Sequence, residues 1–261
     1  MLSCHRRFSG HRRHHRPGAA LRRIIIVAAG LLLALSPVVP ARAQGAAHVA
    51  RASLTGFSLK EVPATGPGDF FAVFLTGDGG WTTLEKRVSA PLIAAGIPVV
   101  GFSQLWYLLR KRSPDRAAAD LGRIIATYRA KWHRNSVVVI GYSRGAGIVP
   151  FAVNRLPALQ RKAVKVVVLL GAEHTAGFQL GIRDLFTTAR RPDEVAVMPE
   201  LRQIHFATIV CVYGEFEGDT LCPELPPPAI LVKMPGTHHF GGKYAEIGTR
   251  IVEIVGAARG P

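Results

Sequence analysis

The sequence predicts an α/β fold with a mostly parallel central sheet and helices on both faces. Apolar runs with the length of buried strands lie at 70–75, 97–102, 137–142, 165–170, 206–213 and 229–234. Helical segments separate most of them, and continuous apolar strands that alternate with helices are typical of a parallel sheet covered on both faces. The chain has 261 residues and is 48% hydrophobic, so it can bury the core of one medium-sized domain.

Helix boundaries are marked by residues that start or stop helices. The segment 82–95 has an amphipathic pattern that ends at Gly96, with Pro98 shortly after. Ser113-Pro114-Asp115 begins a helix that we expect to reach about Trp132, because serine caps the first turn and the acid faces its positive end. Further helices are expected at 146–156 and 244–255. Residues 171–203 contain no clear strand, and we interpret them as an excursion above the sheet.

Residues 1–43 are predicted to be a secretion signal that is removed. They contain eight arginines and no acidic residue, then the apolar run 24–35, then an Ala-x-Ala pattern that ends at Ala43. The apolar run is too short for a permanent anchor, although an uncleaved anchor is the alternative. We therefore expect a single mature domain at 44–261 that is located in the periplasm and is not an integral membrane protein.

The charge of the mature domain is moderate. The net charge of the whole chain is +16, and the eight leader arginines carry half of it, which leaves +8 on residues 44–261. The basic residues do not form the concentrated face with interleaved aromatics that a nucleic-acid-binding protein needs, so nucleic acid is not an expected partner. Local basic clusters favour contact with an anionic membrane surface.

Two cysteines, Cys211 and Cys222, remain after removal of the leader. In an exported protein such a pair indicates a disulfide, and two reduced buried thiols are the alternative. The bridge would tie the segment after the strand at 206–213 back to that strand.

The pattern Gly-x-Ser-x-Gly occurs at 141–145, between an apolar strand and a helix. In this context it is typical of the nucleophile elbow of the α/β-hydrolase fold, in which the turn holds serine in a strained conformation and the glycines avoid clashes. The motif alone is weak evidence. The strand before it and the helix after it make Ser143 the candidate nucleophile.

A serine nucleophile needs a histidine base and a carboxylate, which follow it in that chain order in this fold. Candidate carboxylates stand after the strand at 206–213, where we favour Glu217 over Asp219 and place Glu215 at the surface. Candidate bases follow the strand at 229–234. We favour His239, because an aromatic residue follows it, and keep its neighbour His238 as the alternative.

The loop at 76–81, TGDGGW, follows the first predicted parallel strand and is the expected source of an oxyanion-hole donor. The backbone N–H groups of Asp78 and Arg144 are the two candidate donors, and Gly79, Trp81 and Arg144 are expected to contact substrate with Asp78. The anionic side chain of Asp78 suits an acyl group that carries a cation. Alternatively, Asp78 caps its own tight turn.

The sequence resembles the VirJ family of bacterial virulence proteins and the related domain of AcvB. The resemblance covers about residues 55–255 and rests on TGDGGW at 76–81, GIPVVG at 96–101, Trp106-Tyr107, Ser113-Pro114 with Asp120, GYSRGA at 141–146, NRLP at 154–157, YGEFEGDTLCP at 213–223 and PGTHHF at 235–240. It implies a periplasmic α/β-hydrolase that cleaves the aminoacyl ester of lysyl-phosphatidylglycerol. The chain is nearer the short VirJ form than the longer AcvB form.

These observations predict an exported serine hydrolase that needs no cofactor and no metal, since the adjacent histidines have no further ligands at recognisable spacing. The expected partner is an aminoacylated anionic phospholipid at the membrane surface, and secretion-system components are the further candidate partners. Two alternatives stay open. One is a periplasmic binding or chaperone factor, and the other is a general lipase or esterase without aminoacyl preference.

Overall fold

The computed structural model describes residues 54–181 and 193–258, which all belong to one compact unit, Gly45–Pro261. The expected signal sequence at 1–43 and its cleavage point lie outside the described residues.

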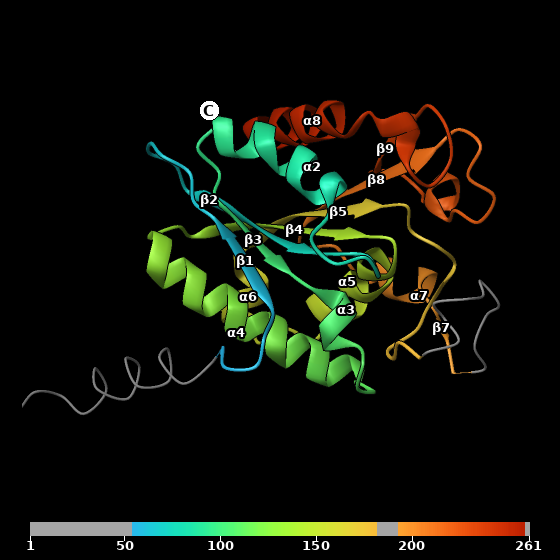
Figure 1. Ribbon diagram of the computed structural model, residues 1–261, viewed down its shortest axis with the longest axis horizontal. Helices are drawn as coiled ribbons and strands as arrows, with labels where there is room; N and C mark the ends of the chain where they lie inside the picture. The colour runs from blue at the N-terminus through green and yellow to red at the C-terminus, as the bar shows by residue number, and fades with distance from the viewer. Residues whose placement is uncertain (1–53, 182–192, 259–261) are drawn as a thin grey trace, which may run out of the picture. The chain divides into compact units, whose positions relative to one another are not determined.

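The core of this unit is a seven-stranded sheet (Figure 1). Its spatial order is β1 (Leu59–Val62), β3 (Val99–Phe102), β2 (Phe70–Leu75), β4 (Ser136–Tyr142), β5 (Val164–Leu170), β8 (Thr208–Gly214) and β9 (Ile230–Met234). Strand β1 runs antiparallel to β3, and all the other neighbours are parallel. The predicted mostly parallel sheet is therefore confirmed, with an antiparallel edge strand added.

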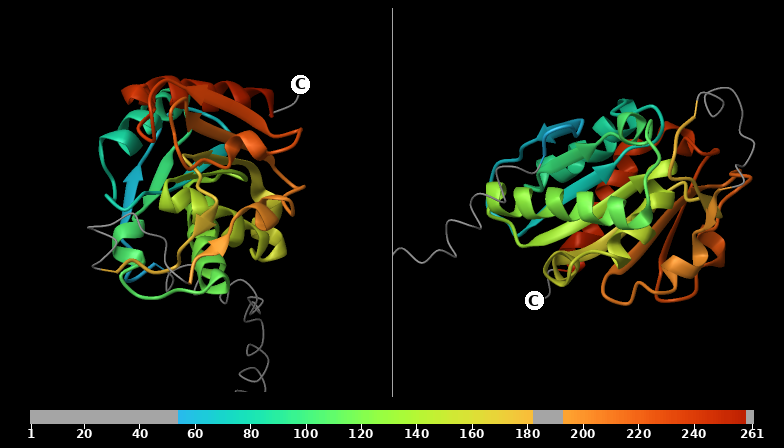
Figure 2. Two further views of the ribbon diagram at one scale, coloured as in Figure 1. Left: turned by 90° about the vertical axis from the view of Figure 1, so that its right-hand side faces the viewer. Right: turned by 90° about the horizontal axis from the view of Figure 1, so that it is seen from below.

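Helices cover both faces of the sheet, as Figures 1 and 2 show. Helices α2 (Thr83–Ala94) and α8 (Tyr244–Ala257) pack together on one face, and α4 (Pro114–Trp132) and α5 (Arg144–Asn154) pack on the other. Alternate residues of each strand point to opposite faces, so Phe71 and Val73 join the α4–α5 core while Phe70 and Phe74 join the α2–α8 core. A sheet buried on both sides needs strands that are apolar at every position, which explains the continuous runs.

Two helix starts are capped by side chains, that of α4 by Ser113 as the sequence predicts and that of α2 by residues for which no cap was predicted. The Ser113 hydroxyl accepts a hydrogen bond from the backbone N–H of Arg116 over 3.1 Å. At α2, Thr82 and Glu85 form a reciprocal capping box, in which the Glu85 carboxylate accepts from the Thr82 backbone N–H over 2.8 Å. Each cap satisfies N–H groups that the helix itself leaves without partners.

Several motif residues outside the elbow have structural partners. Asp120, 1% exposed, accepts hydrogen bonds from the hydroxyl of Tyr107 over 2.9 Å and from Arg116 and Arg123 on its own helix. Tyr107 ends the short helix α3 (Gln104–Tyr107), and so this buried carboxylate joins α3 to α4. The helix α6 (Ala158–Ala163) precedes β5.

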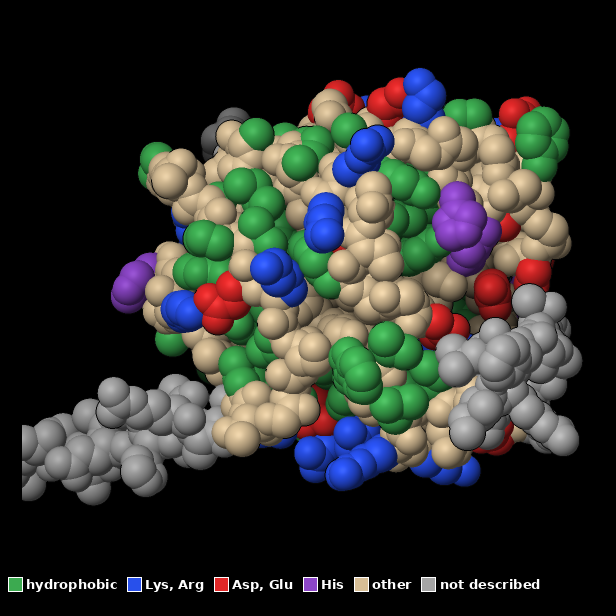
Figure 3. Space-filling model, in the orientation of Figure 1, with side chains coloured by type: hydrophobic (Ala, Val, Ile, Leu, Met, Phe, Trp, Pro, Cys, Tyr) green, Lys and Arg blue, Asp and Glu red, His purple; other side chains and the backbone are tan. Residues whose placement is uncertain are grey.

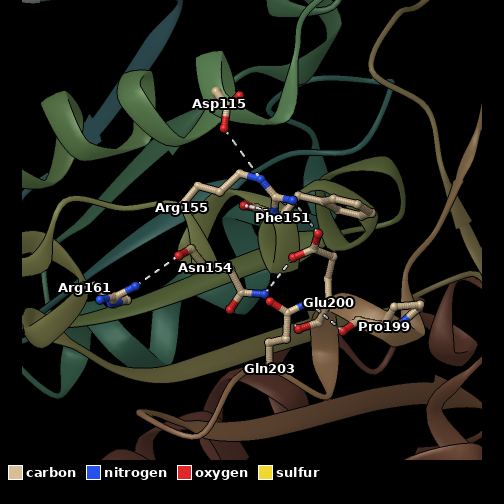
Figure 4. A network of polar contacts seen from close by, with 8 residues as sticks. All are labelled: Asp115, Phe151, Asn154, Arg155, Arg161, Pro199, Glu200 and Gln203. Carbon is tan, nitrogen blue, oxygen red and sulfur yellow. Dashed lines mark hydrogen bonds and ion pairs between the residues drawn. The ribbon is translucent and has the colours of Figure 1, made fainter.

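A buried carboxylate docks the end of the excursion at 171–203 that contains the helix α7 (Met198–Leu201) on the C-terminal end of α5 (Figure 4). The described part of the excursion also contains the paired two-residue strands β6 (Thr175–Ala176) and β7 (Val195–Ala196). Glu200 of α7 accepts hydrogen bonds from Arg155 over 2.7 Å and from Asn154 over 2.8 Å, and Asp115 lies 3.7 Å from Arg155. Residues 182–192 lie outside the described residues.

Candidate active site

Ser143 stands on a sharp turn between β4 and α5. Its backbone has φ 51° and ψ −118°, a region that non-glycine residues rarely occupy. A Cβ at Gly145 would lie 2.3 Å from the carbonyl oxygen of Leu75, and a Cβ at Gly141 would lie 2.5 Å from that of Gly145. Both glycines are therefore required by close backbone approach, as the motif predicts, and the turn lifts Ser143 out of the sheet.

His238 and Glu217 form a short hydrogen-bonded pair beside this turn. The His238 Nδ1 and the Glu217 Oε1 are 2.5 Å apart, and the Glu217 side chain is only 4% exposed. The other carboxylate oxygen of Glu217 accepts the backbone N–H of Gly214 over 2.9 Å. Glu217 follows β8 and His238 follows β9, so the carboxyl ends of two neighbouring parallel strands bring them together.

Gly171 makes room for this pair at the end of β5. A Cβ there would lie 2.7 Å from a ring carbon of His238 and 3.1 Å from a carboxylate oxygen of Glu217. Gly171 also has a φ of +61°, which disfavours any side chain. Its backbone N–H donates to Val212. Gly171 carries no recognisable signal in the sequence, because only the packed structure places it against the pair.

The surroundings of His238 raise the pKa of its imidazole. Burial acts in the opposite direction, since it disfavours the charged ring, but the hydrogen bond and the charge of Glu217 outweigh it, with help from Glu173 and Asp78. The ring also lies against Tyr142, with centroids 5.3 Å apart. With Nδ1 taken by the carboxylate, Nε2 is the nitrogen of His238 that is left to accept a proton.

His239 has a different environment. Its Nδ1 lies 3.0 Å from the hydroxyl oxygen of Tyr142, its side chain is exposed, and no carboxylate among the described residues is bonded to it. The sequence favours His239 as base and Glu217 as acid, whereas in the structure Glu217 is bonded to His238. The sequence cannot decide between His238 and His239, because the conformation of the loop sets the direction in which each side chain points.

Asp219, the alternative acid, is bonded to a third histidine. Its carboxylate pairs with Nδ1 of His174, and Nε2 of the same ring lies 2.7 Å from Glu224. The hydrogen bond to Asp219, and to a smaller extent that to Glu224, raises the pKa of His174. His174 was not among the residues predicted for the site. Glu215 is exposed and forms an ion pair with Lys233.

Asp78 and Arg144 join the glycine-rich loop to the serine turn. The Arg144 guanidinium donates to both carboxylate oxygens of Asp78, over 2.5 and 3.1 Å. A Cβ at Gly77 would lie 3.5 Å from the Cβ of Ser143, so the loop approaches the serine closely. The two residues expected to supply oxyanion-hole N–H groups are thus tied together by their own side chains, and the carboxylate of Asp78 is already paired with a cation.

A cleft of about 380 Å³ collects most of the candidate residues. It is lined by Gly77, Asp78, Gly79, Gly80, Thr82, Thr83, Leu84, Glu85, Tyr142, Ser143, His238, His239 and Tyr244. Trp81, expected to contact substrate, is not in this lining: it packs on Phe74 with ring centroids 5.9 Å apart and covers Gly101. Figure 3 shows histidine side chains at the right of the surface, with acidic side chains below them in this view.

Cys211 of β8 and Cys222 are joined by a disulfide, and both are fully buried. Cys222 begins the short 3-10 helix η2 (Cys222–Glu224). The disulfide therefore ties the segment that contains Glu217 and Asp219 back to β8, as the sequence predicts.

Comparison with known proteins gives the family. The family model for the bacterial virulence protein VirJ matches residues 69–259, which is more than half of the chain. The chain belongs to the VirJ family. No curated protein matches the sequence.

Solved structures similar to this VirJ-family chain show the fold. MenH from S. aureus has a TM-score of 0.57 at 12% identity, covering 77% of this chain and 98% of that one. A putative non-heme bromoperoxidase, BpoC from Mycobacterium tuberculosis H37Rv, has a TM-score of 0.56 at 14% identity, with 77% and 96% covered. Est1E from Butyrivibrio proteoclasticus, with ferulic acid bound, has a TM-score of 0.52 at 12% identity, with 80% and 98% covered. The VirJ-family chain has the α/β-hydrolase fold.

Within 54–181 and 193–258, no three or more His, Cys, Asp or Glu side chains are grouped so that they could hold a metal ion. In the same part of the chain, no helix combines the length and the hydropathy needed to cross a bilayer.

Proposed function

We propose that this protein is a serine hydrolase that cleaves esters, with Ser143 as nucleophile, His238 as base and Glu217 as the carboxylate that orients it. The observation that carries the proposal is the His238–Glu217 pair with its buried carboxylate, beside a cleft that His238 lines together with a serine on a strained turn. A hydroxyl is a poor nucleophile near neutral pH, and a histidine held by a carboxylate removes its proton during attack.

The reaction proceeds through an acyl-enzyme. Ser143 Oγ attacks the ester carbonyl while its proton moves to Nε2 of His238, and the Glu217 carboxylate stabilises the imidazolium through Nδ1. The backbone N–H groups of Arg144 and Asp78 stabilise the negative charge that develops on the carbonyl oxygen. His238 then gives its proton to the departing alcohol, and a water molecule, deprotonated by the same histidine, releases the acid and restores Ser143.

The Asp78–Arg144 pair supports this role of the oxyanion hole in two ways. It fixes the glycine-rich loop against the serine turn, so that both donors keep their positions, and it neutralises a carboxylate that would otherwise repel the oxyanion. It also changes the role expected for Asp78, because a carboxylate already bound by arginine is a poor receptor for a cationic acyl group.

For the substrate we propose the aminoacyl ester of lysyl-phosphatidylglycerol, which the resemblance to AcvB implies. The lysyl ammonium then needs a carboxylate other than Asp78, and Glu173 is the residue we assign. Glu173 follows β5, and the charges of His238 and Arg144 act to lower the pKa of its carboxyl. Glu173 is exposed, so a cationic group can reach it. Partial desolvation of its carboxyl and the charges of Asp219 and Glu194 raise its pKa, so a bound ammonium would stabilise the carboxylate form.

A general esterase is the second candidate, favoured by the paired state of Asp78, which leaves the oxyanion loop without a free carboxylate. Under either function the mature chain acts in the periplasm. The Cys211–Cys222 disulfide, which is stable in an oxidising compartment, and the expected leader support that location.

The test uses residues 44–261 with two substrates: lysyl-phosphatidylglycerol in mixed micelles, followed by lysine release, and a short acyl p-nitrophenyl ester. We expect the wild type to cleave both, and Ser143→Ala to lower both rates by about 10⁴-fold or more. Glu173→Gln is expected to raise KM for the lysyl lipid only. Cleavage of the short ester alone would establish the general esterase, and equal rates for wild type and Ser143→Ala would refute the nucleophile.

A further inference from the structure

A second and larger pocket lies at the opposite edge of the sheet from Ser143. It has a volume of about 760 Å³, twice that of the candidate active-site cleft, and falls in the range of small-molecule sites. It opens where β5, β8 and β9 begin, whereas Ser143, Glu217 and His238 follow strand ends. A strand of seven residues separates the two edges by roughly 20 Å. We call it the amino-edge pocket.

The floor and walls of the amino-edge pocket are apolar. Leu201, Ile204 and Leu225 are almost fully buried at its base, and Phe206, Ile209 and the prolines at 226–228 line the rest. An apolar lining of this size favours a hydrocarbon or aromatic body that leaves water.

The rim of the same pocket is cationic. Lys165, Arg202 and His205 line it, all three are exposed, and none of these side chains is bonded to a described residue. No Asp or Glu is among the lining residues, and Arg161 adds a further cation over the Phe206 ring at 5.9 Å. Unpaired cations around an apolar cavity favour a ligand with an apolar body and an anionic head.

We propose that the amino-edge pocket binds a free single-chain anionic amphiphile, such as a fatty acid or an alkyl phosphate. The chain fills the cavity between β8 and the segment 225–229, and the carboxylate or phosphate head contacts Lys165 and Arg202. This site is separate from the proposed hydrolase site and does not depend on it.

The test measures binding of dodecyl phosphate to residues 44–261 by displacement of fluorescent 11-dansylundecanoic acid, below the micellar concentration. Dodecanol, with the same chain and no charge, is the ligand control. We expect dodecyl phosphate to bind at least about tenfold more tightly than dodecanol, because the head contacts two cations. The double variant Lys165→Gln/Arg202→Gln should lose about that factor, and Ala207→Trp, which fills the cavity, should abolish binding.

The double variant Lys60→Gln/Lys86→Gln makes the same charge change at exposed positions outside the pocket and should bind like the wild type. Circular dichroism and thermal unfolding like those of the wild type verify that all these variants are folded. The proposal is overturned if the wild type does not bind dodecyl phosphate, if dodecanol binds equally, or if both charge variants weaken binding to the same extent. Binding only to vesicles of anionic phospholipid would also overturn it, in favour of a membrane surface.

Discussion

At the residue scale, the two adjacent histidines differ in what their Nδ1 atoms contact. That of His238 lies 2.5 Å from a buried carboxylate, and that of His239 lies 3.0 Å from a tyrosine hydroxyl. A carboxylate fixes the tautomer and stabilises the imidazolium formed during catalysis, whereas a tyrosine hydroxyl does so much less. The proposed roles of the two residues follow from this difference.

Exchange of each histidine tests these roles directly. His238→Ala is expected to lower kcat by about 10²–10⁴-fold, because it removes general-base catalysis. His239→Ala is the matched control and should lower kcat by less than about tenfold. The measurement is steady-state hydrolysis of the short acyl ester by both variants, with circular dichroism as a check on folding. The reverse ranking would make His239 the base.

The raised pKa of His238 predicts the pH profile. The base must be neutral to accept a proton, so kcat/KM should rise with pH through a midpoint above the ordinary histidine value of about 6.5. Glu217→Gln removes the charge that raises this pKa and leaves the burial that lowers it, so the midpoint should move to lower pH while the maximum rate falls. If the pH midpoint of kcat/KM is the same in Glu217→Gln as in the wild type, Glu217 does not raise the pKa of the group that titrates.

The Asp78–Arg144 pair predicts coupling between two substitutions. Arg144→Ala leaves an unpaired carboxylate beside the oxyanion and should lower kcat more than the double variant Asp78→Asn/Arg144→Ala does. The expected coupling energy is roughly 0.5–3 kcal/mol, as for residues in direct contact. A double-mutant cycle on kcat measures it, and strictly additive effects would contradict the role given to the pair.

At the element scale, the predicted helices and strands are found, with ends within a few residues of those expected. Strand β1 was not predicted, because Leu-Lys-Glu-Val at 59–62 has neither the length nor the apolar content of the central strands. It forms because its backbone pairs with the free edge of β3, and this contact depends on the tertiary structure rather than on the local sequence. The short helices α3, α6 and α7 were not predicted for a similar reason, since four to six residues carry too little periodicity.

The contacts of Glu200 with Asn154 and Arg155 should stabilise the docking of α7 on α5. The pKa of Glu200 is lowered by the hydrogen bond from Arg155, so this contribution to stability is present above the ordinary pKa of 4.5 and is lost as pH falls through the lowered value. Glu200→Gln should therefore reduce the free energy of unfolding by about 1.5–3 kcal/mol at pH 7. The difference in the free energy of unfolding between Glu200→Gln and the wild type should become smaller below pH 4.5.

Urea unfolding at several pH values measures this effect. Glu253→Gln is the matched control, since its ion pair with Arg250 has a similar distance of 2.7 Å but both side chains are more than half exposed. It should change stability by less than about 1 kcal/mol. Equal losses for the two variants would mean that burial of Glu200 has no special effect.

At the scale of the whole domain, the parallel sheet assembles the site. Ser143, Gly171, Glu217 and His238 follow β4, β5, β8 and β9, which are neighbours in the sheet although they are far apart in the sequence. Parallel strands end at the same edge, so loops that follow them meet there. The amino-edge pocket lies at the other edge for the same reason.

The disulfide predicts that the stability of the domain depends on redox conditions. Reduction of Cys211–Cys222 should lower Tm by several degrees, because a disulfide contributes about 2–4 kcal/mol. Thermal unfolding of the oxidised protein with and without dithiothreitol measures this. The variant Cys211→Ala/Cys222→Ala is the control, and its Tm should not respond to the reductant. A wild-type Tm that does not respond either would show that the bond contributes nothing.

The sequence alone determined the fold class, the strained turn at Ser143, the two loops from which we propose the acid and the base, and the cysteine pair. Each of these depends on local signals: apolar runs, glycine spacing and chain order. Only the tertiary structure decided which of two adjacent histidines meets Glu217, that Asp219 is bonded to His174, and that Asp78 is bonded to Arg144. These pairings join residues distant in sequence, and a contact between loops is set by how the strands before them are packed.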